Sequence, residues 1–244
     1  MITELLPHNR RLDGAEELEE FYRPPRASHL RVNFISSLDG AVEIDGRSGP
    51  LGGPADRAAF MAMRGLSDVI LVGAGTARAE DYGPVRLRED VQGRRLARGQ
   101  APLPPLAVVT ARGDLQPSAR LFASGGQVIV VTSESVAKSR PDLEAVSEIL
   151  TCGTASVDMV SAVTQLRKRG LGRILCEGGP ELARALVIAG LLDELCLTIA
   201  PLLAGAGRRL VGSAELAAAG RFELLGLLEA EGMLLARYGT RRTA

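Results

Sequence analysis

The distribution of apolar residues divides the chain into short buried segments and longer amphipathic ones. Continuous runs rich in Val, Ile and Leu predict strands that are buried on both faces, as in a parallel sheet. These runs cover residues 30–35, 69–72, 106–110, 128–132, 148–152, 174–176 and 195–199. Helical periodicity fills several of the intervals, most clearly at residues 54–64 and 158–170. The alternation predicts an α/β fold with a mostly parallel central sheet flanked by helices.

The two ends of the chain have patterns of their own. Residues 224–228 and 233–238 flank Glu231 and Gly232, which predicts a C-terminal antiparallel hairpin that closes one edge of the sheet. Residues 13–26 read as a short acidic helix that ends at Pro24-Pro25 and lies outside the core. We therefore expect an N-terminal arm over residues 1–28 and a single domain over residues 29–244.

Two segments have no regular pattern, and both are expected to be surface loops near a site. One is the Arg-rich and Pro-rich stretch at residues 86–105, and the other is the Gly-rich stretch at residues 205–212.

Composition and charge exclude several classes of partner. Lys and Arg number 29, as do Asp and Glu, so no net charge attracts nucleic acid or an anionic membrane. No apolar run approaches the roughly 18 residues of a membrane span, and residues 1–10 do not resemble a secretory signal. Cys152, Cys176 and Cys196 are isolated in strand-like runs, which predicts core thiols in a reducing cytoplasm without disulfides or a metal site.

Two Gly-rich turns follow predicted strands and open helices, at residues 72–76 (VGAGT) and 176–180 (CEGGP). Glycines at such a position let phosphate groups approach backbone N–H groups at a helix start. Arg78 stands where the dinucleotide fingerprint has its third glycine, so the first turn alone is equally well a tight connection. Two such turns at the carboxyl ends of parallel strands favour a nucleotide crevice.

Polar residues at three other strand ends are candidates for the same edge of the sheet. Asp39 precedes Gly40 in what is equally well a simple turn. Thr110 and Arg112 follow one strand, and Thr132 and Ser133 follow the next. Their hydroxyls and the guanidinium suit a ribose 2′-phosphate, although ordinary capping of loop starts explains the hydroxyls as well.

Four ordered motifs carry a family resemblance: residues 33–40 (NFISSLDG), 68–76 (DVILVGAGT), 177–180 (EGGP), and 192–195 (LDEL) followed by 199–201 (IAP). They resemble the riboflavin-biosynthesis pyrimidine reductase family over nearly the whole chain. The resemblance implies a dihydrofolate-reductase-like fold, NADPH as cofactor and reduction of 5-amino-6-(5-phosphoribosylamino)uracil to its ribityl form. The zinc deaminase half of the bifunctional relatives is not expected, because His8 and His29 lie in no H-x-E pattern.

The resemblance also assigns residues. Glu177 and Glu80 fall at carboxylates of the active site, where Glu80 replaces the usual aspartate, and Ser48, Arg64 and Arg86 fall at substrate positions. Arg64 is expected to bind the phosphate, and Arg88 is an equal candidate to Arg86. The residues expected to line the cofactor are Asp39, Gly73, Gly75, Thr76, Thr110, Arg112, Thr132, Ser133, Gly178 and Gly179.

Two departures from the family pattern concern the substrate. Asn33 replaces a lysine on the first strand, and Pro50 replaces an aromatic residue near Ser48. A dihydropterin-like substrate on the same fold therefore stays open, as does a nucleotide-binding subunit without turnover. The expected partners are a small-molecule substrate and a second copy in a homodimer, formed through the apolar hairpin edge, with no nucleic acid or membrane and no metal.

Overall fold

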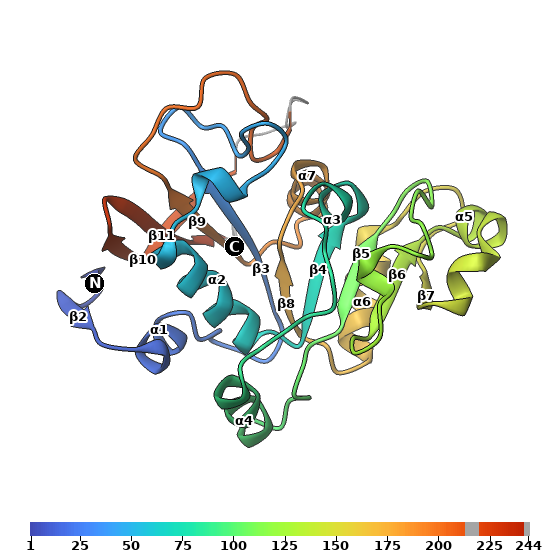
Figure 1. Ribbon diagram of the computed structural model, residues 1–244, viewed down its shortest axis with the longest axis horizontal. Coiled ribbons are helices and arrows are strands. Elements are labelled where there is room, and N and C mark those ends of the chain that lie inside the picture. The colour runs from blue at the N-terminus through green and yellow to red at the C-terminus, as the bar shows by residue number, and fades with distance from the viewer. Residues whose placement is uncertain (213–219, 242–244) are drawn as a thin grey trace.

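The computed structural model describes residues 1–212 and 220–241 and has one mixed sheet with helices on both faces (Figure 1). The strand order of the sheet is β2-β1-β10-β11-β9-β3-β8-β4-β5-β6-β7. Strands β9, β3, β8, β4, β5, β6 and β7 are mutually parallel, and the rest of the sheet is antiparallel.

The strands in chain order are β1 (Ile2–Leu6), β2 (Arg10–Leu12), β3 (His29–Ser36), β4 (Val69–Gly73), β5 (Leu106–Val109), β6 (Val128–Thr132), β7 (Glu148–Thr151), β8 (Arg173–Cys176), β9 (Glu194–Ile199), β10 (Phe222–Ala230) and β11 (Met233–Thr240). The helices are α1 (Ala15–Phe21), α2 (Pro54–Leu66), α3 (Ala74–Ala79), α4 (Glu89–Ala97), α5 (Glu134–Ser139), α6 (Met159–Lys168) and α7 (Pro180–Ile188). Short 3₁₀ turns occupy Gly49–Leu51, Arg120–Phe122 and Pro141–Ala145.

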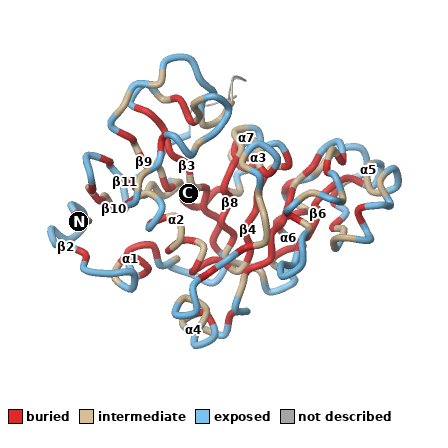
Figure 2. Tube along the Cα trace, viewed as in Figure 1, coloured by how far each residue is buried: buried red, intermediate tan, exposed pale blue. Residues whose placement is uncertain are grey.

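The predicted fold class and every strand predicted from an apolar run are confirmed. The central strands are buried throughout, as the red tube of Figure 2 shows, because helices cover both faces. On one face, Val32 and Leu71 pack with α6 and α7, and on the other, Leu175 and Cys196 pack with α1 and α2. Asp158 caps α6 by accepting from the backbone N–H groups of Val160 and Ser161.

The acidic N-terminal segment is part of the core, so the expectation that it lies outside is wrong. Leu18, Phe21 and Tyr22 are buried against α2 and the sheet. Strand β1 pairs with β10 and β2 pairs with β1, which extends the sheet by two strands. The C-terminal hairpin β10–β11 forms as predicted, but it does not close the edge, because β1 and β2 cover it.

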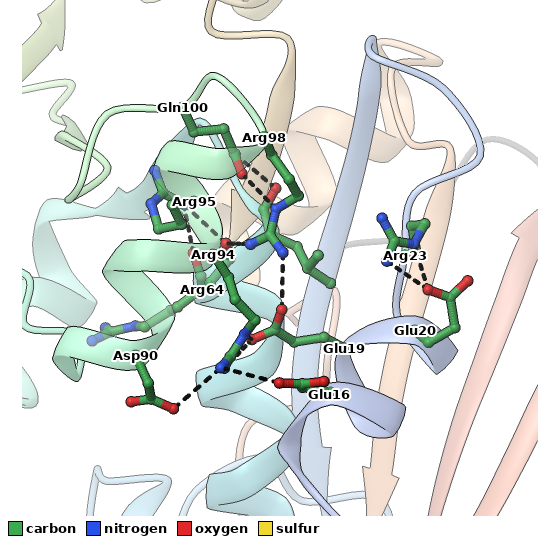
Figure 3. A network of polar contacts seen from close by, with 12 residues as sticks. Glu16, Glu19, Glu20, Arg23, Arg64, Asp90, Arg94, Arg95, Arg98 and Gln100 are labelled. Carbon is green, nitrogen blue, oxygen red and sulfur yellow. Dashed lines mark hydrogen bonds and ion pairs between the residues drawn. The ribbon is translucent and has the colours of Figure 1, made fainter.

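The segment at residues 86–105 is not the predicted loop, because it contains α4. Arg95 of α4 is 1% exposed and donates to the carbonyl oxygens of Gly65 and Ser67 at the end of α2, at 3.1 and 2.6 Å. Arg94 and Arg98 both bind the carboxylate of Glu19 on α1 (Figure 3). Arg94, Arg95 and Arg98 thus join the three helices α1, α2 and α4.

Candidate active site

A buried ionic cluster lies where α2 crosses the carboxyl end of β8. Arg64 Nε and Nη2 each donate to one oxygen of Glu177 at 2.7 Å, and the Tyr82 hydroxyl donates to Glu177 Oε2 at 2.7 Å. The Arg64 guanidinium lies 4.4 Å from the centre of the Phe60 ring. Charge-assisted, bidentate contacts of this kind fix the orientation of both partners.

Burial and charge shift the pKa values of Arg64 and Tyr82 in this cluster. Burial alone would lower the pKa of Arg64, but the adjacent Glu177 carboxylate raises it. Burial raises the pKa of the Tyr82 phenol, and Glu177 raises it further. Glu177 is the acceptor in all three hydrogen bonds, so this geometry favours a positioning role for its side chain. Its predicted catalytic role stays a prediction.

Ser48 and Glu80 are brought together across 32 positions of sequence. Glu80 Oε1 accepts from the Ser48 backbone N–H at 2.7 Å and from its hydroxyl at 2.9 Å. Glu80 follows the last turn of α3, and Ser48 precedes the 3₁₀ turn that leads into α2. The pair therefore ties the loop before α2 to the end of α3, with both side chains half-buried. Glu80, which is one methylene longer than the expected aspartate, makes this contact through Oε1.

Two more polar side chains belong to α2 and to the strands that it covers. Asn33 lies in the middle of β3 opposite Cys196 of β9 and is half-buried. Asp56 lies in the first turn of α2, where it interacts with the Thr198 hydroxyl of β9. Because α2 spans β9, β3 and β8, Asp56, Asn33 and Glu177 follow one another across three adjacent strands.

The two Gly-rich turns contact each other directly, at the ends of adjacent strands β4 and β8. Gly73 N–H donates to the Gly178 carbonyl at 2.8 Å, and a Cβ atom at Gly179 would lie only 2.4 Å from Thr76 Oγ1. Gly178 has a positive φ of 94°, which favours glycine. As a result, α3 and α7 begin side by side (Figure 1). A Cβ atom at Gly75 would meet nothing within 4 Å, which leaves the backbone there open.

The hydroxyls at the ends of β5 and β6 are engaged within the chain. Thr110 Oγ1 accepts from Gly113 N–H at 3.0 Å and donates to Asp114, and Thr132 Oγ1 donates to the Thr110 carbonyl at 2.7 Å. Ser133 caps α5. All three residues are 0–1% exposed, which agrees with the capping interpretation of their hydroxyls. Their predicted contact with the cofactor stays a prediction.

An exposed pair of arginines remains at this edge. The Arg112 side chain is 83% exposed and lies 3.4 Å from Asp114, whose carboxylate also binds Arg78 of α3 at 3.0 Å. Two guanidinium groups thus share one carboxylate, and the surplus positive charge faces solvent. Sequence reasoning noted Arg78 only as a departure from the glycine fingerprint.

Asp39 stabilises the turn after β3 through hydrogen bonds to its carboxylate. Its carboxylate accepts from the Ser37 hydroxyl and from the backbone N–H groups of Ala204 and Gly205, at 3.1 and 2.7 Å for the last two. These bonds, led by that of Ser37, lower the pKa of Asp39 to about 2. The carboxylate therefore fastens the loop after β9 to the loop after β3, which run side by side in Figure 1. Its predicted contact with the cofactor stays a prediction.

Arg86 is not brought to these groups. It is exposed between the buried residues Val85 and Leu87, in the segment that connects α3 to α4. Pro84 already packs beside Gly126, at the amino end of β6. A cavity of about 360 Å³, lined by Pro84, Leu103, Leu106 and Val128, lies at this opposite end, away from the polar cluster.

Tyr82, Asp56 and Arg78 are the site residues that sequence reasoning missed. Asp56 had a detectable signal, because it precedes Arg64 by eight residues and shares its helix face. Tyr82 had none, since its contact with Glu177 depends on the path of an irregular loop.

Within residues 1–212 and 220–241, no helix is both long and apolar enough to cross a membrane. The same residues contain no group of three His, Cys, Asp or Glu side chains arranged to hold a metal ion. All three cysteines are buried and free.

Comparisons with known proteins agree with this geometry. The profile of the RibD C-terminal domain matches residues 28–232. The chain is 30% identical to 2,5-diamino-6-ribosylamino-4(3H)-pyrimidinone 5′-phosphate reductase of Methanothermobacter thermautotrophicus, over 80% of this chain and 90% of the relative. It is also 30% identical to the riboflavin biosynthesis protein RibD of Escherichia coli, over 88% of this chain but only 62% of that protein.

A solved structure shows the same fold over nearly the whole length. The pyrimidine reductase-like protein of Corynebacterium diphtheriae superposes with a TM-score of 0.83, at 27% identity, over 95% of this chain and 100% of that one.

Proposed function

Because the chain belongs to the RibD C-terminal domain family, we propose that it is an NADPH-dependent reductase of a phosphoribosylaminopyrimidine in riboflavin biosynthesis. The sequence resemblance implies 5-amino-6-(5-phosphoribosylamino)uracil, whereas the archaeal relative is named for 2,5-diamino-6-ribosylamino-4(3H)-pyrimidinone 5′-phosphate. In either case the C1–oxygen bond of the ribose breaks, C1 receives a hydride, and the released ring oxygen receives a proton. The product carries an open ribityl chain, and NADPH supplies the hydride and becomes NADP⁺.

The observation that carries the proposal is the Arg64–Glu177–Tyr82 cluster beside the Ser48–Glu80 pair. Glu177 occupies Nε and Nη2 of Arg64, which leaves Nη1 to donate to a substrate phosphate. The Arg64 side chain is 16% exposed, so a phosphate oxygen there would be held in a largely water-excluded place. Glu177 and Phe60 orient the guanidinium before the substrate arrives.

Glu80 is the group proposed to deliver the proton. One of its oxygens is fixed by Ser48, and the other, Oε2, makes no hydrogen bond within the described residues. A half-buried carboxyl with one oxygen anchored and one available suits general acid catalysis at the ring oxygen. Ser48 would then both orient Glu80 and contact the substrate.

The residues proposed to hold NADPH are those of the paired Gly-rich turns. The helices α3 and α7 begin side by side there, and backbone N–H groups at helix starts suit the pyrophosphate. The open backbone at Gly75 allows a phosphate to approach closely. Arg78 and Arg112, with one carboxylate between them, suit the 2′-phosphate that distinguishes NADPH from NADH.

The test is NADPH oxidation, followed at the nicotinamide absorbance, with each of three substrates in separate reactions. They are the phosphoribosylaminouracil, the 2,5-diaminopyrimidinone phosphate and dihydrofolate. Turnover of either ribosylaminopyrimidine supports the proposal, and turnover of dihydrofolate alone would replace it by a pterin reductase. Tight NADPH binding without any turnover would instead support a binding subunit.

We also propose a homodimer, although not through the hairpin edge that the sequence suggested. Leu6, Leu224 and Leu234 are 37–44% exposed, on the face of β1, β10 and β11 that is directed away from α2. An apolar sheet face of this kind suits association of two copies. Sedimentation that gives the mass of one chain at micromolar concentration would contradict this.

A further inference from the structure

The turn that follows α3 has a residue other than glycine in the left-handed region. Helix α3 ends with the two hydrogen bonds of a Schellman cap. The Tyr82 N–H donates to the Ala77 carbonyl at 2.9 Å, and the N–H of Asp81 donates to the Arg78 carbonyl at 3.2 Å. Asp81 has a φ of 48°. Glycine is the usual residue there, because a Cβ atom makes the left-handed conformation costly. The aspartate therefore occupies a position that glycine would fill at lower cost.

The two neighbours of Asp81 reach different parts of the candidate active site. Glu80, directly before it, accepts from the Ser48 backbone N–H and hydroxyl. Tyr82, directly after it, donates to Glu177 Oε2 at 2.7 Å. Because the φ and ψ of Asp81 set the orientation of one neighbour relative to the other, a change at this residue would break at least one of the two contacts.

Arg120 binds Asp81 through both the backbone and the side chain of the aspartate. Nη2 of Arg120 donates to the Asp81 carbonyl, and Nε lies 3.0 Å from Asp81 Oδ2. Arg120 begins the 3₁₀ turn between β5 and β6, and the next residue of that turn, Leu121, is buried in the core. A Cβ atom at Gly83 would lie 3.3 Å from Arg120 Cζ, so the guanidinium lies directly against the turn. An anchored segment thus holds one residue 39 positions away in sequence.

A stabilising ion pair is a poor explanation for this contact. The side chains of Arg120 and Asp81 are 59% and 72% exposed, and ion pairs as exposed as this contribute little to stability. A glycine at position 81 would remove the strain, but it would also remove the carboxylate that Arg120 binds. The contact therefore serves to select one conformation of the turn.

We infer that Arg120 is a positioning residue, which holds Asp81 in the left-handed conformation and thereby directs Glu80 and Tyr82 into the site together. The inference rests on the proposed function, in which Glu80 delivers the proton to the ring oxygen of the ribose. Tyr82 takes part through Glu177, which orients the arginine proposed to bind the phosphate. Arg120 acts through Asp81 and has no contact of its own with the reacting groups.

The experiment compares kcat for the ribosylaminopyrimidine substrate in the wild-type chain and in Arg120→Ala. Loss of a charge-assisted hydrogen bond to the Asp81 carbonyl should lower kcat by about tenfold, because the aligned turn becomes less populated. Arg11→Ala is the matched control, since the Arg11–Asp13 pair has the same separation of 3.0 Å and side chains that are 61% and 73% exposed. The control should change kcat by about twofold or less. An equally small change in Arg120→Ala would overturn the inference.

Asp81→Gly tests whether Arg120 acts through the turn. Glycine adopts the left-handed conformation without a penalty from Cβ, so the turn no longer needs Arg120 to hold it. Adding Arg120→Ala to Asp81→Gly should therefore lower kcat by about twofold or less, in contrast to the tenfold loss in the wild-type background. An equal loss in both backgrounds would show that Arg120 acts elsewhere and would overturn the inference.

Nitration of tyrosine by tetranitromethane, measured by mass spectrometry, separates the inference from the proposed function. Burial raises the pKa of the Tyr82 phenol and Glu177 raises it further, so the reactive phenolate is scarce in the wild type. In Arg120→Ala, Tyr82 should be nitrated up to about tenfold faster. Tyr22, which is 2% exposed in the core, should stay protected.

Each outcome of the nitration experiment has a definite meaning. Equal reactivity of Tyr82 in the two proteins would overturn the inference. Acceleration at Tyr22 as well would show a general loosening of the fold and would also overturn it. Faster nitration of Tyr82 alone, in a chain that turns over neither ribosylaminopyrimidine, would support the role of Arg120 in the turn and overturn only the proposed reaction.

Discussion

Arg64 and Glu177 face each other between α2 and β8, with Nε and Nη2 of the arginine each 2.7 Å from a different carboxylate oxygen. The pair joins a helix to the end of a central strand that is 113 positions away in sequence. Tyr82 adds a third donor from an irregular loop. Three separate segments are therefore held at one point by a single carboxylate.

Arg64→Lys should reduce kcat/KM for the ribosylaminopyrimidine substrate by about 10- to 150-fold, as expected for loss of one charged hydrogen bond. A lysine ammonium cannot span both oxygens of Glu177 and also reach the phosphate. Arg23→Lys, at the exposed Arg23–Glu20 pair, is the control and should be silent. An unchanged kcat/KM in Arg64→Lys would remove Arg64 from the substrate site.

Glu177→Gln separates a positioning role from an acid role in the same assay. If Glu177 only orients Arg64, KM rises and the shape of the pH–rate profile is retained. Loss of one limb of that profile would instead show that Glu177 transfers a proton.

Gly179→Ala should weaken NADPH binding and destabilise the fold by about 1–3 kcal/mol, the usual cost of overpacking. The new methyl group would lie 2.4 Å from Thr76 Oγ1, where the two Gly-rich turns meet. Thr76→Ala removes that atom, so the double variant should be more stable than the sum of the single changes predicts. Additive effects in thermal unfolding would show that the turns do not contact each other.

Arg112→Ala and Arg78→Ala should each raise KM for NADPH by about tenfold and leave KM for NADH unchanged, because only NADPH has a 2′-phosphate to lose a charged contact. Lys138→Ala, which removes an exposed cation on α5, is the control. Equal losses with both cofactors would place the two arginines away from the 2′-phosphate.

Glu194→Gln should lower the free energy of unfolding by about 3–5 kcal/mol, because it leaves buried cations without a counter-charge. Glu194 is 0% exposed and binds His29 Nε2 at 2.7 Å, Arg31 at 3.0 Å and Arg237 at 2.7 Å. Glu20→Gln, at the exposed Arg23–Glu20 pair, should cost about 1 kcal/mol or less.

The same carboxylate predicts a pH dependence of stability. Burial alone would raise the pKa of Glu194, but Arg31, His29 and Arg237 hold it well below its ordinary value. The stabilisation is therefore complete above the unfolded pKa of about 4.3 and is lost as the pH falls further. Urea unfolding between pH 7 and pH 3 should show a fall in stability that is smaller in Glu194→Gln; an identical pH dependence would contradict this.

Arg95→Ala should lower the free energy of unfolding by about 3 kcal/mol, because buried carbonyl oxygens at the end of α2 lose their donor. Arg95 reaches the carbonyls of Gly65, Ser67 and Ala101, and its burial lowers the pKa of the guanidinium to about 10. Arg88→Ala, whose side chain is 83% exposed, is the control. Equal melting temperatures of the two variants would contradict this stabilising role of Arg95.

The sequence by itself determined the parallel strands of the sheet and the edge at which the site is proposed. Strands buried on both faces are continuous apolar runs, so β3 to β9 could be found without tertiary information. The Gly-rich turns could be placed together for the same reason, because the carboxyl ends of parallel strands share an edge. The four ordered motifs, at residues 33–40, 68–76, 177–180 and 192–201, indicated the family without tertiary information.

Only the tertiary structure decided which polar groups are already engaged. Thr110 and Asp39 are polar residues at the correct edge, but their oxygens bind the chain itself, and no local pattern reveals that. The N-terminal strand β1 pairs with β10 across more than 200 positions, and such pairing depends on a free edge rather than on local propensity. Asp56 lies in the first turn of a predicted helix, but its burial and its contact with Thr198 depend on the folded surroundings, not on the helix that carries it.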